Sequence, residues 1–297
     1  MGIFDRFMGR SRNRELISEL EQLSESYNRE VSSLVHIINS IYTQFNLHIE
    51  EVNDIRIASW EQNIEPIQKF LSYFGDAQLT SDYVPEEIKV MVKRPQSEFE
   101  KLDQYIVDND FSDKSMFFES ILKSPLYVSW RNKKANDKIE LNITTLATQF
   151  EQVIHELSLK KEVSELETKI CQLYIETVRF IITFISERIV PELQFILSFF
   201  QAEALKDMIM SNQQVEKVAF DYNIHLLQDT IYQKHYQFIR NAFFFYVISC
   251  KFYNTPVLTK LLTHSAHSED IIELDQYKLM IETQAQQLEK DIFIKSS

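Results

Sequence analysis

The sequence predicts an all-α fold, an elongated multi-helix bundle of long antiparallel helices with little or no β-structure. Only three glycines occur among 297 residues and none follows Gly75, so few positions suit tight turns that require positive φ. Apolar residues recur at steps of three and four along most of the chain, which is the spacing of a helix face. With 44% hydrophobic and 25% charged residues, the composition is that of a folded chain and not of a disordered one.

The first element is a basic amphipathic segment, residues 1–14. Its apolar residues fall at helical 3-4-7-8 spacing, and its four arginines against one acid give it a charge of +3, whereas the whole chain carries −13. A helix of this kind can lie in a membrane interface, attracted by anionic lipid and held by buried aromatic rings. The residues predicted to contact a membrane or a partner are Ile3, Phe4, Arg6, Phe7, Met8, Arg10, Arg12 and Arg14.

The opening MGIF-x-RF resembles the start of the phage-shock and vesicle-inducing family of membrane-remodelling proteins. The resemblance covers this opening alone, and it implies an N-terminal helix that touches a membrane. Beyond it that family continues as a very long charge-rich hairpin, whereas this chain has prolines, aromatic clusters and loops. The alternative is that Ile3, Phe4 and Phe7 pack on the body of the protein or on another subunit, and the residues leave both interpretations open.

The rest of the chain divides into an irregular helical region, residues 15–138, and a long-helix bundle, residues 139–297, although a single continuous domain fits equally well. The predicted loops are Gly75–Pro85 and Ser124–Lys138, where turn-forming residues gather, with shorter connections at Ser211–Gln214 and Asn254–Pro256.

The bundle region contains the clearest helical patterns. One stripe covers residues 146–157, and a second begins at Val163 and continues towards Phe200, which predicts a single helix of about forty residues. Pro191 should bend this helix, because proline removes a backbone donor and crowds the preceding turn. Near the C-terminus Leu274, Ile281 and Leu288 recur at sevens and predict a short seam resembling a coiled coil.

Two apolar stretches, 178–200 and 241–250, are too charged or too short to span a membrane. The aromatic-rich run Tyr232–Tyr253 is more economically the core of a bundle than a ligand pocket. The two cysteines, Cys171 and Cys250, lie in apolar helical patterns and indicate a reducing, cytoplasmic-type compartment.

Several classes of enzyme are excluded by their missing motifs. The chain has no phosphate-binding glycine loop, no dinucleotide fingerprint and no nucleophile elbow, and no Cys-x-x-Cys or His-Glu-x-x-His. His264 and His267 are three residues apart, but a structural zinc site wants four ligands, so we expect a polar link and neither metal nor cofactor. The acidic balance argues against general nucleic-acid binding.

Arg29 and His36 match the loose Arg-x(4–6)-His pattern of the helical HEPN ribonucleases, in which arginine steadies a phosphate and histidine moves a proton. Chance accounts for one such match, and Glu30 would disfavour RNA. The favoured function is therefore a non-enzymatic helical scaffold or subunit that binds other proteins, including copies of itself, with membrane docking through residues 1–14. The alternative is a helical effector enzyme of nuclease type that uses Arg29 and His36.

Overall fold

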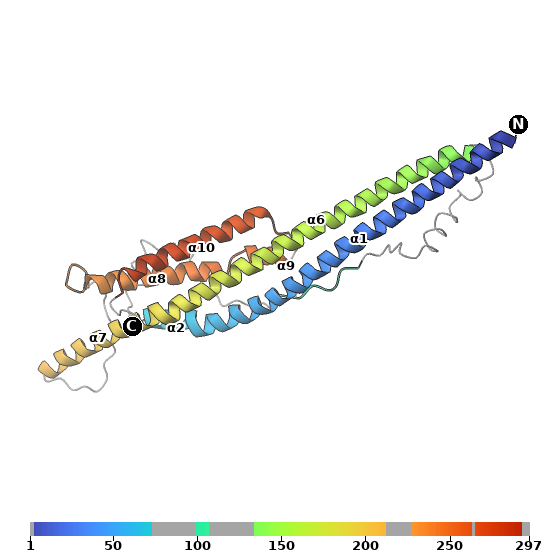
Figure 1. Cartoon of the computed structure of the whole chain (residues 1–297). Helices are drawn as coiled ribbons and strands as arrows, with labels where there is room; N and C mark the ends of the chain where they lie inside the picture. Colours follow the sequence, from blue (N-terminus) through green and yellow to red (C-terminus); the bar gives the residue numbers. More distant parts are fainter. Residues whose placement is uncertain (1–2, 73–98, 107–133, 212–226, 263–264, 293–297) are drawn as a thin grey trace. The chain divides into compact units, whose positions relative to one another are not determined.

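The structure is a computed structural model that describes residues 3–72, 99–106, 134–211, 227–262 and 265–292. Over these ranges the chain is mostly helical and contains no strand, which confirms the predicted all-α class (Figure 1). The elements are α1 (Ile3–Ser59), the π turn η1 (Trp60–Ile64), α2 (Glu65–Ser72), α6 (Lys134–Phe184), the π turn η3 (Ile185–Ile189), α7 (Val190–Met210), α8 (Gln233–Tyr253), α9 (Val257–Leu262) and α10 (Ser268–Glu289). The predicted loop Gly75–Pro85 lies outside the described residues, and the predicted loop Ser124–Lys138 gives way to helix at Lys134.

The chain forms two compact units. Unit 1 consists of Met1–Phe45 and Leu102–Glu165, and unit 2 of Asn46–Lys101 and Leu166–Ser297. Each unit therefore contains part of α1 and part of α6. The predicted boundaries at residues 14 and 138 fall inside these two helices and stay predictions.

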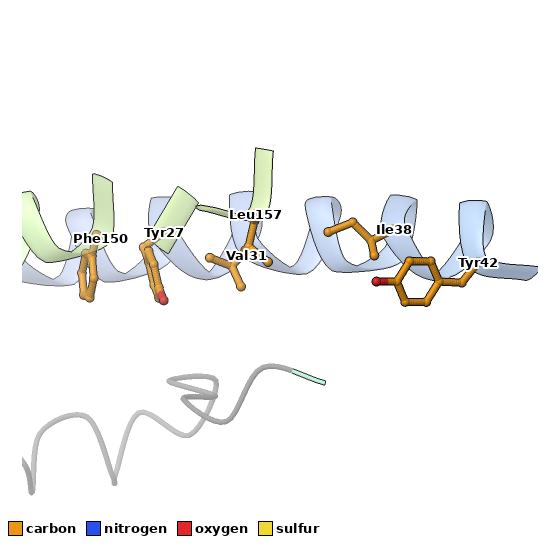
Figure 2. Packing of buried hydrophobic residues seen from close by; sticks show 6 residues of the cluster. All are labelled: Tyr27, Val31, Ile38, Tyr42, Phe150 and Leu157. Atoms are coloured by element: carbon orange, nitrogen blue, oxygen red, sulfur yellow. The ribbon is translucent and has the colours of Figure 1, made fainter. Parts of the chain in front are cut away.

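The core of unit 1 lies between α1 and α6. The ring of Tyr27 stacks on that of Phe150, with centroids 3.9 Å apart and planes inclined by 17° (Figure 2). Both rings are almost fully buried, so the stripe predicted for residues 146–157 does face the core. The buried cluster consists of Tyr27, Val31, Ile38, Tyr42, Phe150 and Leu157.

Contacts inside unit 1 show that α1 and α6 run in the same direction. Tyr27 contacts Phe150, and further along both helices the ammonium of Lys160 lies 5.7 Å from the ring centroid of Tyr42. Residue numbers therefore increase in the same direction along both helices, and the predicted antiparallel arrangement is not confirmed for this pair.

The helix that begins at Lys134 is longer than the forty residues predicted, because α6, η3 and α7 follow one another without a break up to Met210. It passes Pro191 by way of the π turn η3, in which the N–H of Val190 bonds to the carbonyl of Ile185. The other π turn, η1, ends two residues before Pro66, just as η3 ends two residues before Pro191. In η1 the N–H of Glu65 donates to the carbonyl oxygen of Trp60. A proline ring clashes with the carbonyl four residues earlier, and the extra residue of a π turn relieves that clash.

Unit 2 is built around α8, which spans the aromatic run predicted to form a core. Phe238, Phe245 and Phe252 are completely buried, so that prediction is confirmed, although Phe244 remains partly exposed. The helix ends at Tyr253 and α9 begins at Val257, as the turn residues 254–256 predicted.

The predicted C-terminal seam is also buried, in α10. Leu274, Ile281 and Leu288 have no exposed surface, and α10 packs along α8. The side chain of Gln284 donates to the carbonyl oxygen of Asn241 at 3.2 Å, which joins the two helices by a polar contact beside the seam.

Within the described ranges, no helix combines the length and the apolar composition needed to cross a membrane.

Candidate functional site

The predicted membrane or partner segment lies at the start of α1. The backbone is helical from Ile3, as the spacing predicted. The side chains of residues 1–14 lie outside the described part of the structure. The contact role of the eight residues named above therefore stays a prediction.

Arg29 and His36 lie seven residues apart on α1, and both side chains are exposed. Helical geometry places them on one face, as the pattern predicted. The structure gives neither side chain an enclosed position, so it provides no observation in favour of the nuclease interpretation.

His264 lies outside the described residues, and His267 sits at the start of α10. The main-chain N–H of His267 donates to the carboxylate of Asp270 at 2.7 Å, and Lys260 forms an ion pair with the same carboxylate. Burial by itself would raise the pKa of Asp270, but the bonds from Lys260 and from the His267 N–H outweigh it and lower the pKa. The stretch is a polar link between helices, as predicted. In the residues that the structure covers, no group of three or more His, Cys, Asp or Glu is placed to hold a metal ion.

Two asparagines of α1 bond to the main chain of residues 99–106. In unit 2 the side-chain amide of Asn53 donates to the carbonyl oxygen of Phe99 at 2.9 Å, and its Oδ1 accepts the N–H of Phe99 at 2.8 Å. In unit 1 Asn39 makes the same pair of bonds to Tyr105, at 3.2 Å and 2.6 Å. We call each pair an asparagine clamp.

An asparagine clamp recognises a peptide group and not a side chain. The amide of asparagine offers one acceptor oxygen and a donor nitrogen, so it pairs with a main-chain N–H and C=O as a neighbouring β-strand would. The clamps therefore fix the course of residues 99–106 along α1 without reading their sequence. They satisfy main-chain groups that have no helix or sheet partner.

The side chains of the clamped residues do pack on helices. The ring of Phe99 is buried in unit 2, where the guanidinium carbon of Arg56 lies 4.7 Å from its centroid. Tyr105 and Leu102 pack against the core cluster of unit 1. Lys101 points away from this packing and forms an ion pair with Glu50 of α1, between two exposed side chains.

A third asparagine, Asn46, lies midway between the clamps, seven residues from each. This feature was not among the predictions, although two signals for it are present in the sequence. Asn39, Asn46 and Asn53 recur at sevens, and Phe99, Leu102 and Tyr105 recur at threes.

The strongly shifted pKa values in unit 2 have a structural cause. Burial raises the pKa of Tyr174, although the nearby guanidinium of Arg56 acts in the opposite direction. The hydroxyl of Tyr174 donates to the main-chain oxygen of Tyr253 at 3.3 Å. Burial also raises the pKa of Tyr253, so both tyrosine hydroxyls stay neutral at ordinary pH and serve in packing.

Both cysteines should be unreactive in the folded protein. Cys171 and Cys250 are free and buried; burial raises both pKa values, that of Cys250 to about 12. Because the thiolate is the reactive form, we expect a thiol reagent at about pH 8 to label neither cysteine until denaturant is added. Labelling followed by mass spectrometry, with Cys171→Ser and Cys250→Ser to assign the sites, measures this. Rapid labelling of the native chain would contradict the burial of these thiols.

His235 should make the protein less stable at mildly acidic pH. It is buried among aromatic rings, with centroids 5.9 Å from Phe199 and 6.2 Å from Tyr232, and burial lowers its pKa although Glu192 acts in the opposite direction. The unfolded chain then binds the proton more readily, so the free energy of unfolding should fall as pH drops below the ordinary histidine value of about 6.5.

Urea denaturation at several pH values should show this loss in the parent chain and a smaller one in His235→Phe. The exposed His36, changed to Gln, is the control and should leave the pH dependence as it is. Equal slopes for the parent and His235→Phe would contradict the role of His235.

Comparisons with protein-family models, with curated proteins and with solved structures find no match to this chain.

Proposed function

We propose that this protein is a non-enzymatic helical scaffold, a subunit that binds other proteins. The observation that carries the proposal is the pair of asparagine clamps, by which α1 holds an extended chain through its main chain. Holding an extended segment in this way is a general mode of protein recognition, since backbone bonds supply affinity and side-chain contacts supply selectivity.

The chemistry of the described side chains agrees with this proposal. The groups whose pKa values are most strongly shifted are tyrosines and cysteines buried in helix packing. A catalytic site normally sets such groups in a cleft that substrate can enter. Here they support the core, and Asn39 and Asn53 of α1 bond to a peptide main chain.

Peptide binding by the full chain tests the proposed function. The probe is a fluorescent peptide with the sequence of residues 99–106, FEKLDQYI, used beside a peptide of the same composition in another order. Anisotropy is measured with the parent chain, with Asn39→Ala/Asn53→Ala, and with the Phe99→Ala/Tyr105→Ala variant in which the internal segment is held less tightly. The proposal is supported if the parent or the Phe99→Ala/Tyr105→Ala variant binds either peptide, and if replacing Asn39 and Asn53 by alanine abolishes this binding.

A matched control is available on the same helix. Gln22 and Gln44 are exposed amide side chains of α1, so Gln22→Ala/Gln44→Ala removes two amides without touching a clamp. This variant should bind as its parent does. The peptides are tested at concentrations up to about a millimolar, the effective concentration of a tethered segment. If neither peptide binds the parent or the Phe99→Ala/Tyr105→Ala variant, α1 does not bind peptides in trans and the proposal fails.

We propose in addition that the scaffold docks at an anionic membrane surface through the first residues of α1. The helical backbone from Ile3 supports this, because it gives the apolar residues and the arginines of the segment the spacing of one helix surface. A reducing, cytoplasmic-type compartment belongs to the same proposal and is supported by the two buried free cysteines.

Sedimentation with liposomes tests the docking. The full chain should bind anionic vesicles and release them as salt rises, and Phe4→Ser/Phe7→Ser should abolish binding. Arg12→Gln should weaken it by about fivefold, on the scale of about 1 kcal/mol for each basic residue near the surface. Arg29→Gln, in the exposed part of the same helix, is the matched control. Equal binding by the phenylalanine variant and the parent would contradict docking through residues 1–14.

A further inference from the structure

We infer that the exposed face of α10 is a docking site for the basic first turns of α1, residues 3–14, of a second copy of this chain. The inference rests on the proposed function of a scaffold that binds proteins, and it names one segment that the scaffold binds. The site is a stripe along α10 that we call the outer stripe. It consists of Ile272, Gln276, Leu279, Thr283 and Gln286.

The outer stripe lies opposite the face by which α10 packs on α8. Ile272 comes two residues before the buried Leu274, and two residues of helix turn by about 200°. Leu279 stands in the same relation to the buried Ile281. Ile272 is 57% exposed and Leu279 is 64% exposed, and Met280 beside them is 48% exposed. Large apolar side chains therefore recur at sevens on both faces of α10, and α8 covers one of them.

The spacing of the outer stripe fits a partner helix. Its five residues follow one another at steps of four and three, which is the pattern of a coiled-coil seam, and all five are uncharged. The stripe is apolar at Ile272 and Leu279 and polar further along, at Thr283 and Gln286. A helix that lies parallel to α10 should therefore be apolar in its first turns and polar after them.

Acidic side chains beside the outer stripe select the charge of the partner. α10 has six acidic residues and one lysine, which gives it a net charge of −5. Asp275, Glu282 and Glu289 recur at sevens next to the stripe, and within the described ranges no cation pairs with them. The lysine, Lys278, is paired with Glu176 of α6 at 3.5 Å. Charges that flank a coiled-coil seam set the choice of partner, so the partner helix should be basic.

The first turns of α1 have the complementary composition. Residues 1–14 carry a charge of +3, and the backbone is helical from Ile3. Four apolar residues lie within residues 3–8, and three of the four arginines lie within residues 10–14. The segment is thus apolar first and basic after, in the order that the outer stripe requires of a parallel helix. A second α10 would instead bring its own charge of −5 against the first.

The segment then has two acceptors of the same chemistry. The outer stripe offers apolar surface beside negative charge, as an anionic membrane does, and one segment cannot occupy both. A membrane surface should therefore compete with the second copy. Self-association in solution should fall when anionic vesicles are added.

Peptide binding tests the site. A fluorescent peptide of residues 1–14, MGIFDRFMGRSRNR, is titrated with the full chain that carries Phe4→Ser/Phe7→Ser, so that the chain's own segment does not compete. We expect binding that weakens as salt rises. Adding Ile272→Ser/Leu279→Ser should weaken it at least about tenfold, because both apolar anchors are lost. Adding Asp275→Asn/Glu282→Gln should weaken it and reduce its salt dependence.

The matched control removes apolar surface elsewhere in the same unit. Ile209 and Met210 of α7 are 69% and 82% exposed, so Ile209→Ser/Met210→Ser should leave peptide binding as it is. A peptide of the same fourteen residues, reordered so that the apolar residues are spread around the helix, should bind at least about tenfold more weakly. All the replaced side chains of α10 and α7 are exposed or half-exposed, and circular dichroism checks that each variant folds.

Sedimentation velocity tests the same contact between whole chains. The parent should self-associate as its concentration rises. Phe4→Ser/Phe7→Ser and Ile272→Ser/Leu279→Ser should each abolish this, because each removes one side of the contact. Mixing these two variants should restore a one-to-one complex, since each retains the surface that the other lacks.

Three results would overturn the inference: peptide binding that survives Ile272→Ser/Leu279→Ser, equal binding of the reordered peptide, or no complex in the mixture of the two variants. The proposed function is measured separately, by FEKLDQYI and by vesicles, and Ile272→Ser/Leu279→Ser should change neither. Failure of the α10 contact therefore leaves the proposed function standing. If the clamps bind no peptide while the mixed variants do form a complex, the chain assembles with itself without being a peptide scaffold.

Discussion

Replacement of Phe252 by alanine is expected to lower the free energy of unfolding by about 3–5 kcal/mol, the usual cost of removing a buried aromatic ring. Phe252 has no exposed surface, and its ring stacks on Tyr174 with centroids 5.1 Å apart and contacts Tyr277 at 6.3 Å. Its loss would open a cavity where α8 meets two other helices of unit 2. Urea denaturation followed by far-ultraviolet circular dichroism measures the change.

Phe244→Ala is the matched control for this prediction. Phe244 belongs to the same helix but is 39% exposed, so its removal should cost much less. Similar losses for both variants would contradict the packing described for α8.

Replacement of Phe150 by alanine should have an effect of similar size, about 3–5 kcal/mol, on unit 1. Phe150 is 5% exposed, and its stacked contact with Tyr27 is the closest ring pair of this unit's cluster in the described residues. Leu159→Ala, at a position 48% exposed, is the control and should change stability little. A neutral Phe150→Ala would mean that the ring stack does not hold α1 to α6.

Hydrogen exchange can show whether the two units unfold separately. Phe150→Ala should reduce protection in the first half of α1, and Phe252→Ala should reduce it in α8. An equal loss in both places in both variants would indicate that the units unfold as one.

Periodicity predicted the helices of this chain but not their directions. The buried seam at Leu274, Ile281 and Leu288 follows from spacing, because spacing alone decides which face of a helix is apolar. Whether two helices run parallel depends on where the chain travels between them, and a stripe contains no such information. The predicted antiparallel arrangement therefore had no support in the residues, and Tyr27 and Phe150 contact each other in a parallel pair.

The prolines illustrate a second limit. Pro191 predicted a bend in the long helix; the structure places a π turn directly before Pro191, through which the helix continues, and the bend itself stays a prediction. Proline chemistry specifies which bond is lost, whereas the packing of residues on both sides decides whether the helix ends, bends or widens.

The clamps were missed for a different reason. Asparagine in a helix normally lowers propensity and is exposed, so single asparagines of α1 carried no signal. The signal was the pairing of a seven-residue repeat with a three-residue repeat in a separate segment, Phe99 to Tyr105. Neither repeat has meaning until the two segments are known to lie together.

Each asparagine clamp constrains its two partners unequally. Asn53 bonds to the main-chain N–H and C=O of Phe99, and Asn39 makes the same pair of bonds to Tyr105. Any residue except proline offers those two main-chain groups, so the clamped residue can be exchanged without loss of the bonds. The asparagine supplies both bonds from its own side chain, so substitution at Asn39 or Asn53 should be tolerated less than substitution of the residue that it holds.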